Sequence, residues 1–379
     1  MFIDIIRLRE GLLVAVVVAL IPAYNEEGSI GATIEALLAQ TRVPDRIVVI
    51  PNGCTDKTAE IARSYQEQSD ALIVFELSKL EHKKSEALNR AWNAYGRDAD
   101  VILSIDGDTC LPDNAVADWE KELASDSKLG GSSSKATMLG PNFWTRMQRS
   151  EFAMWNDHAL RRGWTTVLVG TGCAINGKAL RSIVDETSRE GPWSYDSQVE
   201  DFELTCQIRK RGYYCHVSPT VRAYTDSMKS FSTLWNQRMK WQVGTIEDLL
   251  KMGLNRLTLL DWWQQCVALS MTLVRLLWFT LIVLQIALGL FQFNAIWWVV
   301  VPVLFSIGGG IMTNRIPFRD KWDILIGYTV IISEFFSMIR SAWFVAAWIE
   351  VLWGKLTGSR KDRWEIQYSA EDRAAAVSA

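Results

Sequence analysis

The feature of the sequence that most constrains the fold is a change in hydrophobic pattern near residue 250. Before about residue 245, short apolar runs alternate with polar and amphipathic segments, which is typical of a soluble α/β protein. After about residue 260 the apolar runs become long, and ten of the 18 tryptophans lie at or beyond Trp262. Tryptophan is enriched where proteins meet the membrane–water interface. The pattern therefore predicts a globular part followed by a membrane-associated part.

Strand-length apolar runs alternate with helical segments over the first 110 residues. This alternation predicts an α/β fold, a mostly parallel sheet with helices on both faces. In such sheets, ligands bind beyond the carboxyl ends of the strands. The expected strands are Leu12–Ile21, Arg46–Pro51, Leu72–Leu77 and Val101–Ile105, and the expected helices are Ile30–Gln40, Asp56–Gln66 and Lys84–Tyr95.

Polar motifs follow three of these strands: PAYNEE, PNGCTD and DGD. In the last motif, Asp106 and Asp108 are two residues apart, so their carboxylates point to one side of an extended chain. Two carboxylates about 4 Å apart repel by roughly 4 kcal/mol at an effective dielectric of 20. A D-x-D sequence alone is often a solvated turn. At the end of a buried strand it favours a hard divalent cation, Mg²⁺ or Mn²⁺, that accompanies a phosphate.

Three further groups have both a structural and a chemical interpretation. Lys84 either begins an exposed helix or supplies positive charge for a phosphate. Glu200 and Asp201 either cap the helix that follows them, or Asp201 acts as a general base. Gln237, Lys240 and Trp241 share one helical face because they stand at i, i+3 and i+4; this face either packs on the core or binds a sugar.

Taken in order, PAYNEE, Asp56 in PNGCTD, DGD, VED at 199–201 and QRMKW at 237–241 resemble a membrane-bound family 2 glycosyltransferase. This group has a GT-A fold and includes cellulose, chitin and hyaluronan synthases. The resemblance covers roughly residues 14–250. It implies an inverting, metal-dependent transfer of a sugar from a nucleotide-diphosphate sugar, with UDP as the expected nucleotide. The GT-A fold would be followed by C-terminal interface and transmembrane helices.

The resemblance also implies roles for particular residues. The catalytic pair would be Asp201, as the base, and Glu200. The metal would be Mn²⁺ or Mg²⁺ on Asp108 and Asp106. The nucleotide would be bound by Pro22, Tyr24, Glu26, Asp56, Lys84 and Asp106, and the acceptor and diphosphate region would be lined by Gln237, Arg238, Lys240 and Trp241. In this sequence Lys240 stands where the family motif Q-x-x-R-W has arginine, so a bidentate guanidinium is replaced by a point charge.

The C-terminal part contains several candidate membrane segments. Residues 266–291 carry one charge, Arg275, and residues 296–313 carry none, so the two are expected to form a hairpin. The third apolar segment, 324–353, contains Glu334 and Arg340. It is a single crossing, a re-entrant pair or a helix in the membrane interface.

These patterns predict a chain of four parts. Residues 1–245 form a cytoplasmic GT-A domain, 246–265 amphipathic interface helices, 266–353 the membrane region, and 354–379 a basic and then polar cytoplasmic tail. The first apolar run is an internal strand rather than a signal peptide, because removing it would destroy the sheet. The net charge of −3 does not favour nucleic acid as a partner.

The expected reaction is sugar transfer to an acceptor hydroxyl at the membrane surface, with a glycan as the first choice of acceptor. A polyprenyl-phosphate lipid or a protein is the alternative acceptor. A membrane-anchored nucleotide-sugar binder without catalysis is a more remote alternative. The expected partners are thus the donor, the acceptor and the bilayer, and the C-terminal helices leave room for a homo-oligomer.

Overall fold

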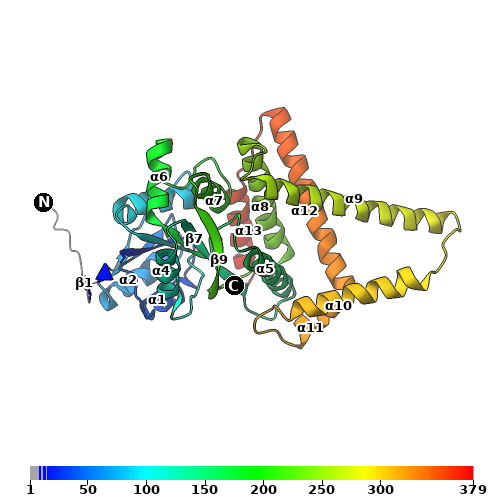
Figure 1. Cartoon of the computed structure of the whole chain (residues 1–379), viewed down its shortest axis with the longest axis horizontal. Helices are drawn as coiled ribbons and strands as arrows, with labels where there is room; N and C mark the ends of the chain where they lie inside the picture. Colours follow the sequence, from blue (N-terminus) through cyan, green and yellow to red (C-terminus); the bar gives the residue numbers. More distant parts are fainter. Residues whose placement is uncertain (1–7, 10–11, 14, 379) are drawn as a thin grey trace. The chain divides into compact units, whose positions relative to one another are not determined.

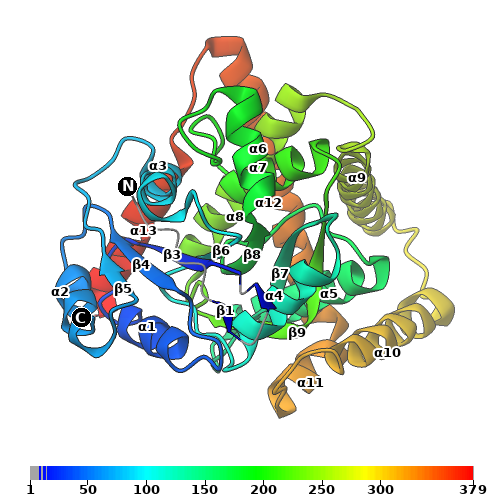
Figure 2. The same ribbon diagram turned by 60° about the vertical axis from the view of Figure 1, so that its left-hand side comes forward.

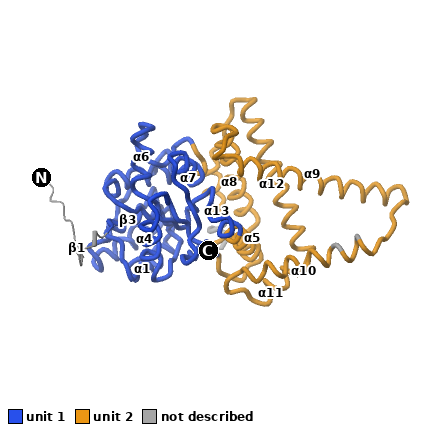
Figure 3. Tube along the Cα trace, in the orientation of Figure 1, with its two compact units in different colours: residues 1–137, 158–196, 200–226 blue, residues 138–157, 197–199, 227–379 orange. Residues whose placement is uncertain are grey.

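The computed structural model describes residues 8–9, 12–13 and 15–378 and divides them into two compact units. Unit 1 comprises residues 1–137, 158–196 and 200–226, and unit 2 comprises 138–157, 197–199 and 227–379 (Figure 3). The chain therefore passes between the units several times.

Unit 1 is built on a seven-stranded sheet with the strand order β5-β4-β3-β6-β8-β7-β9. The first four strands in this order are parallel, whereas β8 is antiparallel to both β6 and β7. The predicted mostly parallel sheet is confirmed. The strands are β3 (Val17–Ala23), β4 (Arg46–Pro51), β5 (Leu72–Val74), β6 (Val101–Ile105), β7 (Leu129–Met138), β8 (Gly172–Asn176) and β9 (Tyr214–Thr225), and β1 (Leu8–Arg9) pairs with β2 (Leu12–Leu13) outside this sheet.

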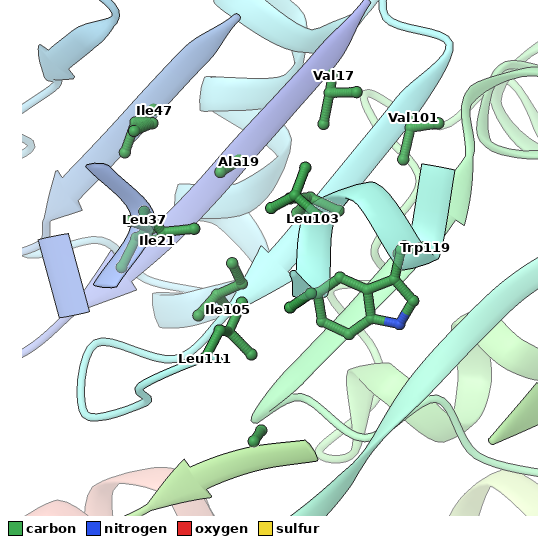
Figure 4. Close-up of a cluster of buried hydrophobic side chains, with 14 of the residues drawn as sticks. Val17, Ala19, Ile21, Leu37, Ile47, Val101, Leu103, Ile105, Leu111 and Trp119 are labelled. Atoms are coloured by element: carbon green, nitrogen blue, oxygen red, sulfur yellow. The ribbon is translucent and has the colours of Figure 1, made fainter. Parts of the chain in front are cut away.

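Helices cover both faces of the sheet because successive strand residues point to opposite sides. Val17, Ala19 and Ile21 of β3 pack with α1, α2 and α4, whereas Val18 and Leu20 pack with α3, α6 and α7. Figure 4 shows the first of these clusters around Trp119, and Figure 2 shows the strands between α1 and α3. The helices are α1 (Ile30–Leu38), α2 (Thr58–Ser64), α3 (Lys83–Ala91), α4 (Ala115–Ser125), α6 (Gly177–Thr187) and α7 (Glu200–Lys210).

Several predicted boundaries in unit 1 differ from the structure, such as that of β5, which ends at Val74 rather than at Leu77. The apolar run at 12–21 does not form one strand, since β3 begins at Val17, whose backbone N–H donates to the Asp45 carboxylate at 2.9 Å. The helix predicted to end at Tyr95 leaves the α-helical conformation after Ala91 and continues as a π-helical turn at Trp92–Gly96.

Unit 2 is helical, and among its described residues two helices are long and apolar enough to cross a bilayer. They are α9 (Leu259–Ala287) and α12 (Val330–Thr357), with mean hydropathies of 2.2 and 1.5 over their most apolar 18 residues. Figure 1 shows both as long helices, and their length and composition indicate membrane association. The other elements are α8 (Phe231–Met252), a π-helical turn (Ile296–Val300), α10 (Val301–Thr313), α11 (Lys321–Tyr328), α13 (Arg363–Ser378) and α5 (Phe143–Arg162), which the two units share.

The apolar segment 324–353 lies in two helices rather than one. The helix α11 ends at Tyr328 and α12 begins at Val330, because Thr329 takes an extended conformation with φ −100° and ψ 99°. Asp320 begins α11 with a capping box, in which its side chain accepts hydrogen bonds from the backbone N–H groups of Trp322 and Asp323. The segment therefore joins a short capped helix to a long apolar one.

Candidate active site

The first two polar motifs form loops that are held together at the carboxyl ends of β3 and β4. The Asp56 carboxylate accepts hydrogen bonds from the backbone N–H groups of Glu27 and Thr58, each at 3.0 Å. In return, Glu26 donates its backbone N–H to the Thr58 hydroxyl at 2.7 Å. Asn25, in the left-handed region with φ 54°, accepts from the Thr55 N–H. Both loops therefore have fixed positions relative to each other.

The DGD loop adjoins PAYNEE at its glycine. The Thr33 hydroxyl of α1 donates to the Gly107 carbonyl at 2.9 Å. A Cβ atom on Gly107 would lie 3.2 Å from Cγ of Glu26 and 3.4 Å from Cβ of Ala23, so a side chain here would crowd the neighbouring loop. Glu26 itself accepts from the Ser29 hydroxyl at the start of α1. The three motifs thus converge on one edge of the sheet, as the strand order requires.

Lys84 of α3 lies at the centre of a cluster of carboxylates. Its Nζ atom is 2.6 Å from Oδ1 of Asp106 and 3.2 Å from Oε1 of Glu200, and its side chain is 13% exposed. Burial alone would lower the pKa of Lys84, but Asp106, Glu200 and Asp201 together raise it well above the usual range. Lys84 is therefore a permanently charged residue that joins the DGD loop to the start of α7.

A pocket opens beside this cluster, and the proposed base lines it. Asp201 lies in the first turn of α7, where its carboxylate accepts the Phe202 N–H at 2.8 Å. Gly170 forms another part of the wall, because a Cβ atom there would lie 2.9 Å from the Lys84 ammonium. The lining residues are Lys84, Leu88, Ser104, Leu168, Gly170, Cys173, Ile175, Trp193, Glu200, Asp201 and Leu204.

Asp108 is the second carboxylate of the DGD loop, and its surroundings are strongly acidic. Burial, followed by the charges of Asp106 and Asp226, raises its pKa to about 7, although hydrogen bonds from Thr225 and Thr109 act in the opposite direction. The Thr225 hydroxyl donates to Oδ1 of Asp108 at 3.1 Å. Such a site has a deficit of positive charge, and a divalent cation would remove it.

The donor set of this acidic region fits a hard cation, since it consists of carboxylates with hydroxyl neighbours. Among the described residues, no group of three or more His, Cys, Asp or Glu side chains lies close enough together to hold a metal ion without other ligands. Asp106 is already paired with Lys84, which leaves Asp108 and Asp226 as the acidic neighbours. One or two carboxylates suffice for Mg²⁺-type sites that also use substrate phosphates.

Asp226 and Gly170 were absent from the residues named by sequence reasoning. Asp226 follows β9 directly, so the signal that would have found it is again a polar residue at the end of a strand. Gly170 lies in the Gly-rich turn before β8. The hydrophobic alternation weakens after residue 110, where β8 runs antiparallel to its neighbours. This pattern therefore predicted neither β8 nor β9.

The remaining predicted residues lie on α8 in unit 2. Arg238 is buried and donates to Oε2 of Glu151 at 2.9 Å and to Oε1 of Gln237 at 2.9 Å, and its guanidinium lies 4.2 Å from the centre of the Trp241 ring. Lys240 is also buried, with Nζ 3.1 Å from the centre of the Trp364 ring. Both cations of the QRMKW motif therefore contact indole rings.

Comparisons with known proteins identify the family of a chain with this fold and site. A family model described as "Glycosyl transferase family group 2" matches residues 101–312, more than half of the chain, and a second model, "Glycosyl transferase family 2", matches residues 18–183. The chain therefore belongs to glycosyltransferase family 2. Enzymes of this family take a sugar from a nucleotide-sugar donor and pass it to an acceptor.

Relatives with curated descriptions agree with this assignment. The chain is 27% identical over 238 residues to "Probable glycosyltransferase YdaM" of Bacillus subtilis, an alignment that covers 61% of this chain and 56% of that protein. It is 26% identical over 238 residues to "Poly-beta-1,6-N-acetyl-D-glucosamine synthase" of Staphylococcus aureus, covering 61% and 55%. The chain thus spans about half the length of the curated relatives it matches.

A solved structure supports the GT-A fold. The mannosyltransferase PcManGT from Pyrobaculum calidifontis, solved with GDP-Man and Mn²⁺, superposes with a TM-score of 0.55 at 17% sequence identity. The superposition covers 90% of this chain and 88% of that one. At this identity the likeness concerns the fold, and the predicted GT-A fold is confirmed by it.

Proposed function

We propose that this protein transfers a sugar from a UDP-sugar to an acceptor hydroxyl at a membrane surface, with inversion at the anomeric carbon. The observation that carries the proposal is the pocket in which Lys84 contacts Asp106 and Glu200 while Asp201 lines the wall. A binding protein needs charge for a diphosphate. It does not need an additional carboxylate at the wall, whereas a transferase needs a base there.

The donor would lie along the carboxyl ends of the strands. Pro22, Tyr24, Glu26 and Asp56 belong to the two joined loops and would surround the nucleotide base and ribose. Asp56 would act mainly by shaping these loops, because its oxygens accept hydrogen bonds from their backbone. Lys84 and Asp106 would lie beside the diphosphate.

A divalent cation, Mn²⁺ or Mg²⁺, would be held by Asp108 together with the diphosphate. Asp106 and Asp226 would complete the negative surroundings, since both raise the pKa of Asp108. When bound, such an ion neutralises the charge that develops as the nucleoside diphosphate leaves. The carboxylates of the chain would hold the ion, and Thr225 and Thr109 orient Asp108.

Asp201 would be the general base. Its carboxylate would take the proton of the acceptor hydroxyl while the hydroxyl oxygen bonds to the anomeric carbon and the bond from that carbon to the diphosphate oxygen breaks. The helix N-terminus and the hydrogen bond from Phe202 favour the ionised carboxylate before the reaction. Glu200 is the poorer candidate for the base because it is 5% exposed and paired with Lys84, so it would position that lysine.

For the acceptor, we take a glycan as the first candidate. Gln237 and Trp241 would contact it, with the Trp241 indole as the stacking surface, and the buried Arg238 and Lys240 would support this part of the acceptor region. The relative named for poly-N-acetylglucosamine makes UDP-N-acetylglucosamine the first donor to test. A polyprenyl phosphate or a protein acceptor is the alternative, and the test below separates them.

The membrane would be contacted by α9, α10 and α12, with the catalytic domain, residues 1–245, in the cytoplasm. The apolar surface of α9 supports this arrangement, since Leu273, Val274 and Leu277 are each more than half exposed. Residues 246–265 would then form the interface segment, and residues 354–379 would return to the cytoplasm. Association of two chains through the membrane helices is compatible with this surface.

The decisive experiment measures donor use by the purified full chain in detergent. Thermal shifts with Mn²⁺ and a panel of UDP-, GDP- and TDP-sugars identify the donor, and release of the nucleoside diphosphate is then followed with a β-linked oligosaccharide, a short polyprenyl phosphate or a peptide as acceptor. We expect one UDP-sugar to stabilise the protein and to be consumed only with its acceptor. If no donor changed the melting temperature and no nucleoside diphosphate were released, the proposal would be contradicted.

A further inference from the structure

Two cations on the neighbouring strands β7 and β9 lack a carboxylate partner. Lys135 of β7 donates from Nζ to the Pro219 carbonyl at 2.5 Å, and Arg222 of β9 donates from Nη1 to the Thr137 hydroxyl at 2.9 Å. Both acceptors are neutral. Over the described part of the chain, neither cation has a carboxylate oxygen within 4.0 Å. Both side chains are only partly exposed, so water screens their charge incompletely.

The two charges also oppose each other. Burial first, and then the nearby Arg222, lower the pKa of Lys135, while burial lowers the pKa of Arg222. Glu122 is the acid that acts on Lys135, but its oxygens already accept hydrogen bonds from Ser132 at 2.5 Å and Ser218 at 2.6 Å, and contact His216 at 3.0 Å. The cations are thus held together without a fixed counter-ion, an arrangement that costs stability and is common at functional sites.

The local backbone orients this pair. The Ser218 hydroxyl accepts hydrogen bonds from the N–H groups of Thr220 and Val221, at 3.2 and 2.9 Å, and this turn presents the Pro219 carbonyl to Lys135. After the turn, Val221 and Ala223 face the core beside α4. Arg222 and Tyr224 therefore face the opposite side of the strand.

The pair lies a short distance from the proposed metal site. Two residues beyond Arg222, Tyr224 exchanges both backbone hydrogen bonds with Cys110, at 2.8 and 2.9 Å, and Thr225 then contacts Asp108. At about 3.3 Å per residue, Arg222 lies roughly 10 Å from Thr225 along the strand, with the two side chains on opposite faces. The pocket residues Leu88, Cys173 and Leu204 belong to the core cluster on the face of Arg222, so an acceptor whose hydroxyl reached the pocket could extend towards this pair.

We propose that Lys135 and Arg222 bind a phosphate group carried by the acceptor. The proposal rests on the proposed function, because it names the acceptor class of the same site. A guanidinium fork and an adjacent ammonium match the oxygens of a phosphate ester, and a neutral glycan would leave both charges unpaired. The phosphate has two sources, a polyprenyl phosphate or a phosphorylated sugar, and the experiment separates them.

The test measures binding to the purified full chain rather than turnover. The probes are farnesyl phosphate, with farnesol as its uncharged counterpart, and glucose 6-phosphate, with glucose. They are titrated into the native protein and into the double variant Lys135→Gln/Arg222→Gln. The matched control is Lys128→Gln/Arg63→Gln, which makes the same charge change at exposed positions of unit 1. Binding of UDP with Mn²⁺ is measured in each protein.

We expect the native protein and the control to bind one phosphate probe at least tenfold more tightly than the double variant, with UDP affinity within twofold. Loss of farnesyl phosphate binding would assign a lipid acceptor, and loss of glucose 6-phosphate binding a phosphorylated sugar. Arg222→Lys, which keeps the charge without the fork, should be intermediate. The double variant should be at least as thermally stable as the native protein, because a repulsion is removed; a purely structural role predicts a lower melting temperature.

Equal affinity of every phosphate probe for native and double-variant protein would overturn the proposal, as would absence of binding to the native protein. A destabilised double variant with unchanged probe affinity would overturn it as well. These results differ from failure of the proposed function, which would appear as loss of UDP binding by the native protein. If the native protein bound a phosphate probe but not UDP, the phosphate site at Lys135 and Arg222 would be supported and the proposed transferase activity would be contradicted.

Discussion

Two buried charge clusters, one in each unit, have opposite excess charge. In unit 1, the ammonium of Lys84 lies among three carboxylates, those of Asp106, Glu200 and Asp201. In unit 2, the carboxylate of Glu151 lies between two guanidiniums, at 2.9 Å from Arg238 and 3.4 Å from Arg340. The first cluster borders a pocket, whereas Glu151 and Arg238 are each 4% exposed.

The two clusters differ in what balances their excess charge. The surplus guanidinium charge in unit 2 already has a partner, because Arg238 lies over the electron-rich face of Trp241 and near the rings of Phe152 and Trp155. The surplus carboxylates in unit 1 instead border the pocket, where the positive charge of a bound ligand complex can balance them. A complete cluster is expected to hold helices together, and an incomplete one to bind a ligand. Each prediction below tests that distinction.

The largest effect is expected from Asp201→Asn. The amide has nearly the same shape and keeps an oxygen for the Phe202 N–H, but it cannot take the acceptor proton. We expect kcat to fall by about a thousandfold or more, which corresponds to roughly 4 kcal/mol in the barrier. Donor affinity should change by less than twofold. Steady-state kinetics and donor titration measure the two quantities, and Asp185→Asn, an exposed acid on α6, is the control.

The second prediction compares the two clusters directly through Lys84→Met and Arg238→Met. Each substitution leaves buried carboxylate without its main cation, so each should lower the free energy of unfolding by about 3 kcal/mol. Only Lys84→Met should also weaken binding of the nucleotide donor, by tenfold or more. Chemical denaturation and donor titration separate the effects. Equal losses of donor affinity in both variants would mean that the clusters do not differ in the way described.

Asp108→Asn tests the charge deficit through stability. The pKa of Asp108 is about 7 in the folded protein and 3.8 ordinarily, so the folded state holds this proton more tightly than the unfolded state. The stabilisation from the protonated group is complete below about pH 4 and is lost as the pH rises through 7. In metal-free buffer at pH 8, the amide variant should therefore be more stable than the native protein, by about 4 kcal/mol if the whole shift is expressed.

The difference should shrink towards pH 4, and added Mn²⁺ should stabilise the native protein alone. Asp113→Asn, an exposed acid after the same loop, is the control for an effect of charge in general. If the variant were as stable as the native protein at every pH, with and without Mn²⁺, then ionised Asp108 would not destabilise the fold and would not bind the ion.

The carboxylates of unit 1 were predictable from sequence because parallel strands end at one edge. Asp106, Asp108 and Asp56 follow predicted strands, and the structure places their loops in contact. Asp201 was named as the base from the helix start and the family resemblance. Its place on the pocket wall agrees with that role, which remains a prediction until it is tested.

The carboxylate that completes the cluster of unit 2 was not predictable in the same way. Glu151 lies 87 residues before Arg238 and belongs to a helix, so it does not follow a predicted strand. The pairing of the two residues depends on how their helices pack. The sequence also predicted that Gln237, Lys240 and Trp241 share one helical face. The structure stacks Arg238 on Trp241, which an i, i+3 spacing also permits. Helical spacing alone does not decide between two neighbouring cations.

The smallest effect is expected from Gly170→Ala, which adds one methyl group to the incomplete cluster. The new carbon would lie 2.9 Å from the Lys84 ammonium and 3.7 Å from Oδ2 of Asp106, so the flexible lysine must move by a few tenths of an ångström. We expect a loss of about 1 kcal/mol in stability and a severalfold rise in the KM for the donor. Gly308→Ala, where the added carbon meets nothing within 4 Å, should leave the KM for the donor unchanged. If the two variants behaved alike, the position of Lys84 within its cluster would not matter for donor binding. The Lys84 cluster would then differ from the Arg238 cluster only in being more exposed to solvent.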